Sequence, residues 1–192
     1  FGISRESTDS LYGKTMKTSI SRLEQYRRCP FAFHLKYGLK VDEKEELAIR
    51  SIDTGSFMHD VIDTFFERTK DIYNESNDSI KTVVYNIIDE KLKMSPNYIF
   101  TSSPKYIVLT ERLSKVVYES ILYIVEQLRN SKFEIKEHEV EFNDGKEYKP
   151  ITLELEDGRK VELTGKIDRV DTAKINDREY VRIIDYKSSV KE

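Results

Sequence analysis

The sequence predicts a fold that combines helices and strands, with the helices first: either an α+β fold or an α/β core preceded by helices. Three observations predict it. Apolar residues recur at helical spacing up to residue 130. From residue 133 the pattern changes to alternation, with many β-forming residues. The length of 192 residues is that of one domain.

The N-terminal part begins without a periodic pattern. Residues 1–18 are therefore expected to be an irregular lead-in to a domain that spans 19–192. Ser19 or Ser21 can cap a short helix that runs to about Arg28. A proline stops a continuing helix, and one follows directly at Cys29-Pro30.

Longer elements follow in order. Helices or helical turns are expected over 31–39, 55–69, 79–94 (capped by Asn77 or Asp78) and 104–130, with a charged loop over 40–52. Two of these helices carry apolar core stripes, formed by Phe57, Met58, Val61, Ile62, Phe65 and Phe66, and by Ile107, Leu113, Val117, Ile121, Ile124, Val125 and Leu128. Strands are expected over 134–143, 150–156, 160–171 and 179–187, with turns at 143–145 and 157–158.

Composition excludes several classes of protein. A single cysteine cannot form an intrachain disulfide and suits a reducing, cytoplasmic compartment. No apolar run approaches the roughly 20 residues of a membrane span. The net charge of −3 does not predict a protein that merely coats nucleic acid, although a confined basic path would suffice for contact with DNA. The chain begins with Phe1 rather than Met, so we expect a piece of a longer polypeptide.

Two carboxylates and a lysine stand near the C-terminal end. Asp168 and Asp185 each follow a mostly apolar stretch that is predicted to be a strand, 181–184 in the second case. Neighbouring strands would bring the two carboxylates together, and close carboxylates repel unless a cation lies between them. Oxygen ligands of this kind select Mg²⁺ or Mn²⁺. Lys187, two residues after Asp185, could orient a water or neutralise charge on a phosphate, which suits hydrolysis of a phosphodiester.

These segments resemble a known family. Gly165-Lys-Ile-Asp-Arg169 and Ile184-Asp-Tyr-Lys-Ser-Ser189 resemble the core motif of the PD-(D/E)XK nuclease superfamily in its RecB-like branch. Further upstream, 19–31, 37–39 and 55–59 resemble the nuclease domains of the AddB type. The resemblance implies an α/β fold of the restriction-endonuclease type, with a mixed sheet, a helical N-terminal portion and C-terminal helices missing.

The resemblance also implies roles for individual residues. It assigns a divalent metal, Mg²⁺ or Mn²⁺, to His59, Asp168, Asp185 and the backbone carbonyl of Tyr186. It gives the catalytic roles to Asp168, Asp185, Lys187 and an upstream acid, Glu139, with the neighbouring Glu141 as the alternative. Cys29 matches the first of four ligands of a 4Fe-4S cluster, which is expected only in the full-length protein.

The implied function is metal-dependent exonucleolytic cleavage of DNA within an AddAB-type helicase-nuclease. This complex would process double-strand ends for recombinational repair, with an AddA-type helicase-nuclease subunit as the partner. Two alternatives remain open: a catalytically silent DNA-binding or scaffolding domain of the same complex, and a stand-alone Cas4-like exonuclease. The basic residues Arg22, Arg27, Arg28, Lys36 and Lys40 form either a solvated face or a DNA edge, and His34 and His138 are expected to be structural.

Overall fold

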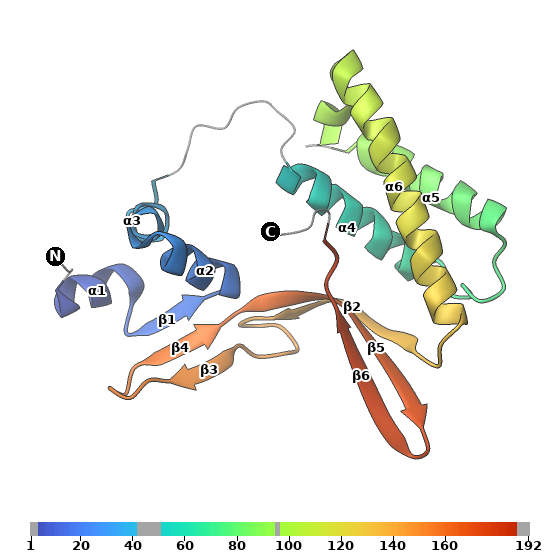
Figure 1. Cartoon of the computed structure of the whole chain (residues 1–192). Coiled ribbons are helices and arrows are strands. Elements are labelled where there is room, and N and C mark those ends of the chain that lie inside the picture. Colours follow the sequence, from blue (N-terminus) through green and yellow to red (C-terminus); the bar gives the residue numbers. More distant parts are fainter. Residues whose placement is uncertain (1–3, 42–50, 95–96, 188–192) are drawn as a thin grey trace. The chain divides into compact units, whose positions relative to one another are not determined.

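The computed structural model describes residues 4–41, 51–94 and 97–187 (Figure 1). The chain divides into two compact units. One is formed by residues 1–45 and 140–167, and the other by 46–139 and 168–192. Strands β2 and β5 each run from one unit into the other. The candidate site belongs to the second unit.

The first unit holds short helices and a mixed three-stranded sheet. Its elements are α1 (Arg5–Tyr12), β1 (Thr15–Thr18), α2 (Ile20–Arg28), α3 (Pro30–Phe33), a π-helical turn (His34–Gly38), β3 (Ile151–Glu154) and β4 (Lys160–Leu163). The strand order is β1-β4-β3, with β1 parallel and β3 antiparallel to β4. Ser19 caps α2 as predicted, since its hydroxyl accepts a hydrogen bond from the Arg22 amide.

The N-terminal segment differs from the irregular lead-in that its sequence predicted. Residues 5–12 form α1, whose N-cap Ser4 accepts a hydrogen bond from the Ser7 amide, and residues 15–18 form β1. The α1 helix buries none of its residues, so it has no apolar stripe that a sequence pattern could show. β1 is ordered by pairing with β4, far away in the sequence.

The second unit is built around three packed helices: α4 (Ser51–Arg68), α5 (Asn77–Leu92) and α6 (Pro104–Arg129) (Figure 1). A 3₁₀ helix (Asn97–Thr101) places Phe100 in the same core. Both predicted apolar stripes are buried there, except Met58, which is partly buried, and Ile107, which is 43% exposed in the first turn of α6. The N-cap of α5 is Ser76, rather than Asn77 or Asp78 as predicted.

The strands of the second unit form a sheet of order β2-β5-β6, from β2 (Glu134–Phe142), β5 (Gly165–Ile175) and β6 (Arg178–Ile184). An Asn176-Asp177 turn with positive φ at both residues joins β5 to β6. The sequence predicted one strand over 160–171, but it divides at Thr164, whose amide bonds to Thr18 of the other sheet.

The last strand is shorter than the sequence predicted, and it is exposed although its sequence is mostly apolar. β6 ends at Ile184 and lies at the edge of its sheet, with Val181 61% and Ile183 66% exposed. The predicted loop over 40–52 falls mostly outside the described residues, as do Ser188 and Ser189 of the C-terminal motif. Among the described helices, none combines the length and the apolar character needed to cross a membrane.

Two leucines of α6 test the placement of the core. Leu128 is fully buried, whereas Leu109 is 38% exposed on the same helix. Leu128→Ala should lower the free energy of unfolding by about 2–5 kcal/mol, because it leaves a cavity among packed side chains. Leu109→Ala should cost less than about 1 kcal/mol. Urea denaturation followed by circular dichroism measures both; equal losses would contradict this core.

Candidate metal centre

The β5–β6 pair brings the two motif acids to one end of the sheet. The antiparallel ladder pairs Arg169 with Ile184 at this end, so Asp168 and Asp185 are the next residues along the two strands. Beyond the ladder, the Asp168 carboxylate accepts a hydrogen bond of 2.6 Å from the Tyr186 amide. A side chain thus continues the strand pairing by one step and fixes the backbone between Asp185 and Lys187.

Three side chains from different elements gather beside this contact. His59 of α4, Glu139 of β2 and Asp168 of β5 each offer a ligand atom, and these atoms lie within 4.8 Å of one another. His59 Nδ1 is 3.6 Å from Asp168 Oδ1. Asp168 is only 9% exposed, and the other two residues are half-buried. An imidazole and two carboxylates are a donor set that accepts Mn²⁺ or Mg²⁺, so these residues fit a divalent cation.

Glu139 has an unusual backbone conformation for a strand residue. Its φ is 51°, in the left-handed region that costs a residue with a side chain roughly 1–2 kcal/mol. Strained residues of this kind cluster at functional sites. The structure also separates Glu139 from Glu141, the alternative acid, because Glu141 makes an ion pair of 2.6 Å with Lys146.

The main chain of Tyr186 lies directly at this group of side chains. Its carbonyl oxygen is 2.9 Å from His59 Nε2 and accepts a hydrogen bond from it when that nitrogen carries the proton. The rings of Tyr186 and His59 meet edge to face, with centroids 5.7 Å apart. The carbonyl that the family resemblance names as a metal ligand therefore lies beside His59, while the amide of the same residue binds Asp168.

Asp185 and Lys187 form an exposed pair next to the group. Their side chains are 59% and 57% exposed, and Asp185 Oδ2 lies 2.5 Å from Lys187 Nζ. They project together as predicted, although β6 has ended before them. Asp185 is not among the three gathered side chains of the described chain, so its role as a ligand stays a prediction.

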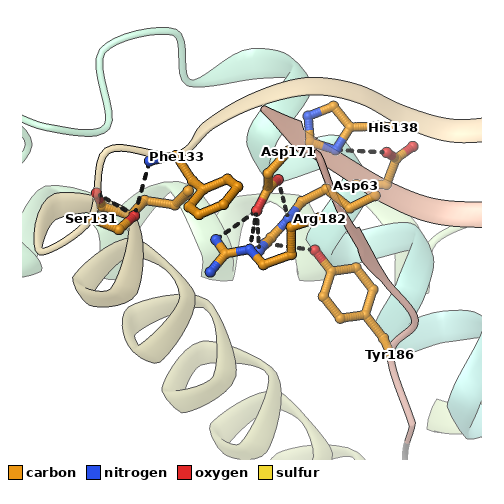
Figure 2. Close-up of polar contacts among 9 residues, drawn as sticks. Asp63, Ser131, Phe133, His138, Asp171, Arg182 and Tyr186 are labelled. Atoms are coloured by element: carbon orange, nitrogen blue, oxygen red, sulfur yellow. Dashed lines mark hydrogen bonds and ion pairs between the residues drawn. The ribbon is translucent and has the colours of Figure 1, made fainter. Parts of the chain in front are cut away.

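A buried charged cluster behind the site was not anticipated from the sequence (Figure 2). Arg169 and Asp171 are 1% and 0% exposed, and Arg182 binds the same Asp171 carboxylate. Arg169 also donates a hydrogen bond of 3.0 Å to the Tyr186 hydroxyl. Burial raises the pKa of Tyr186 to about 12, against the opposing effect of the Arg169 charge. The available signal was the Arg-x-Asp spacing in a strand, which puts both charges on one face.

The two histidines expected to be structural make local contacts. His138 lies 3.7 Å from Asp63 (Figure 2). It stacks on Phe66, and its pKa is lowered, chiefly by burial and then by the Arg169 charge. His34 Nδ1 lies 3.0 Å from the Tyr12 hydroxyl in the first unit. Neither belongs to the metal-ligating group of the described residues.

A cavity of about 640 Å³ opens beside the group. Its walls come from α4, α6 and the sheet, and include His59, Tyr123, Gln127, Tyr186 and Lys187. It leaves room next to the site for a bound molecule. Cys29 lies in the first unit, exposed, where it caps α3 through a 3.5 Å contact of its Sγ with the Ala32 amide.

A sequence profile of the PD-(D/E)XK nuclease superfamily matches residues 17–192. The chain belongs to this superfamily. It is also similar to proteins named as the B-type subunits of ATP-dependent helicase/deoxyribonucleases. Identity is 43% to that of Clostridium novyi, 41% to that of Acetivibrio thermocellus and 39% to that of Clostridium acetobutylicum, over 98–99% of the chain. The chain spans 17% of the length of each of these relatives.

Membership of the superfamily confirms the family and the fold class that the motifs predicted. The helices and two sheets agree with an α/β PD-(D/E)XK nuclease fold. His59, Glu139 and Asp168, which the family resemblance singled out separately, come together in the structure.

The strain at Glu139 leads to a stability prediction. Glycine adopts positive φ freely, so Glu139→Gly should leave the free energy of unfolding unchanged or raise it by up to about 1 kcal/mol. The exposed Lys136 of the same strand has no positive φ, and Lys136→Gly should cost about 0.5–1 kcal/mol. Chemical denaturation compares the two variants. A larger loss for Glu139→Gly than for Lys136→Gly would argue against strain at this position.

Proposed function

We propose that this chain is a nuclease domain that hydrolyses DNA phosphodiester bonds with the help of Mg²⁺ or Mn²⁺. The observation that carries the proposal is the meeting of His59, Glu139 and Asp168 in a chain of the PD-(D/E)XK nuclease superfamily. A helix and two strands supply one ligand each, so folding is needed to assemble the group. Such a set can bind a divalent cation that neither the unfolded chain nor an isolated element would hold.

Each residue of the site has a proposed task. His59, Glu139 and Asp168 would hold the cation, and Asp185 and the Tyr186 carbonyl would complete its ligands. When bound, the cation would polarise the phosphodiester and promote attack by water. An exposed ion pair contributes only about 0–1 kcal/mol, so the pairing of Asp185 with Lys187 is easily exchanged for other partners.

Lys187 is the proposed catalytic cation. Its side chain is 57% exposed and lines the cavity, on the chain segment that Asp168 holds through Tyr186. From there it can orient the attacking water or neutralise charge that develops on the phosphate oxygens. Asp168, Asp185 and Lys187 are all present, which favours an active nuclease over a catalytically silent scaffolding domain.

The relatives suggest the setting of this activity. Their name describes one subunit of an ATP-dependent helicase/deoxyribonuclease. We infer that the chain acts in an AddAB-type complex in the cytoplasm, with an AddA-type partner, as an exonuclease on DNA ends. The motor that unwinds DNA would lie outside this chain.

The activity can be tested in the complete complex. Asp168→Asn and Lys187→Ala should each abolish cutting by this domain, while ATP-driven unwinding persists. Loss of a metal ligand should slow cutting by about a thousandfold or more, because the cation supplies several kcal/mol of charge stabilisation. The measurement is nuclease rate on linear duplex DNA with Mg²⁺, and EDTA should stop the reaction.

Two exposed positions of the β5–β6 hairpin provide matched controls. Asp177 and Lys174 have fully exposed and 76% exposed side chains, so Asp177→Asn and Lys174→Ala change the same charges away from the site. Both should cut at the normal rate. Normal cutting of both DNA strands by Asp168→Asn would contradict the proposed nuclease site.

The proposed 4Fe-4S cluster concerns the complete protein. This chain has one cysteine, so its own residues do not fit a cluster held by four thiolates, and three further thiolates must come from elsewhere. Cys29→Ser should remove iron and visible absorption from the complete protein, and serine should keep the cap of α3. Iron analysis after anaerobic purification measures this. Equal iron in both proteins, or none in the wild type, would contradict the assignment.

A further inference from the structure

Arg169 is a charged side chain buried almost completely next to the candidate metal centre. Its guanidinium carbon lies 5.9 Å from the ring centroid of Phe66 and 5.7 Å from that of Tyr186. Its Nε is 2.9 Å and its Nη2 3.1 Å from the Asp171 carboxylate. Moving a charge out of water costs several kcal/mol, and its attraction to a partner only partly offsets this cost. A contribution to stability is therefore a poor explanation for such a residue.

The charges in this cluster are also unequal. Arg182 binds Asp171 through Nε and Nη2, at 3.1 and 2.7 Å, so two guanidinium groups share one carboxylate. Arg182 alone would already neutralise Asp171. Arg169 is thus the surplus cation, and what distinguishes it is its hydrogen bond to the Tyr186 hydroxyl.

Tyr186 connects this cluster to the candidate ligands. Its hydroxyl accepts a hydrogen bond from Arg169, its amide donates to Asp168, and its carbonyl oxygen lies 2.9 Å from His59 Nε2. Three separate contacts therefore hold Tyr186, at its hydroxyl, its amide and its carbonyl. Because one residue makes all three contacts, a phenol that is held in place limits how far the Tyr186 amide and carbonyl can move away from Asp168 and His59.

We propose that Arg169 is a positioning residue of the metal centre, which acts on Asp168 and His59 through Tyr186. Asp171 and Arg182 hold Arg169 in place, and Arg169 holds the phenol. Groups that hydrogen-bond to metal ligands without touching the metal commonly lower the metal affinity by about 10–100-fold when they are removed. The inference rests on the proposed function, since it requires that Asp168 and His59 bind a cation.

The test compares Mn²⁺ affinity in variants of the complete protein. Tyr186→Phe removes only the hydroxyl, and Arg169→Met removes the surplus cation while Arg182 still neutralises Asp171. Each should weaken Mn²⁺ binding by about tenfold or more, measured by the electron paramagnetic resonance signal of free Mn²⁺. Tyr180→Phe is the matched control, because Tyr180 is 44% exposed on β6, and it should bind Mn²⁺ normally.

A purely structural role predicts a different result. It would lower the thermal midpoint of unfolding and leave Mn²⁺ affinity unchanged below that temperature. Wild-type affinity in both folded variants would overturn the inference, and Tyr186→Phe alone decides the matter if Arg169→Met does not fold. The relevant Mn²⁺ site is the one that Asp168→Asn removes. If Asp168→Asn removes no site, the proposed function fails, and the inference fails with it.

Discussion

The hydrogen bond from the Tyr186 amide to the Asp168 carboxylate is the contact on which the candidate site depends. It lies just beyond the last ladder pair of β5 and β6, at the point where the described chain leaves the sheet. Tyr186 is partly buried, and an amide that loses water without gaining a partner is unfavourable, so the Asp168 carboxylate is held by a main-chain donor as well as by its own charge. The same contact sets the path of the chain through Asp185 and Lys187.

Several residues around this contact have conformations or surroundings that are unfavourable for the stability of the fold. Glu139 takes a left-handed conformation within a strand, and Arg169 and Asp171 are buried as charges. None of these features is what a sheet would adopt for stability alone. Their energetic support comes from the apolar core of α4, α5 and α6, in which Phe65, Val117 and Leu128 are fully buried. A rigid helical scaffold can hold a strained polar site in one arrangement.

The arrangement divides the chemistry between buried and exposed groups. Asp168 is nearly buried and held by two contacts, which suits a ligand whose position must not vary. Lys187 and Asp185 are largely exposed and held mainly by each other. Such side chains can exchange partners when a substrate arrives, because a surface ion pair contributes little. The cavity beside them, bordered by Tyr123 and Gln127 of α6, provides the space for this exchange.

The sequence by itself determined the helices of the core, the family and the motif acids. Periodic apolar residues predicted the bounds of α4 and α6 to within a few residues, because a helix that buries one face has apolar residues at regular spacing along the sequence. The motif around Asp168 and Asp185 predicted a PD-(D/E)XK nuclease, and the family comparison confirmed it. Only the tertiary structure decided which side chains meet: Glu139 rather than Glu141, and the Arg169–Tyr186 contact. These contacts depend on the positive φ of Glu139 and on pairing between segments that are distant in the sequence, and patterns of neighbouring residues do not predict either. The helix and strand within residues 1–18 escaped prediction for the same reason, since β1 is stabilised by β4 rather than by its own sequence.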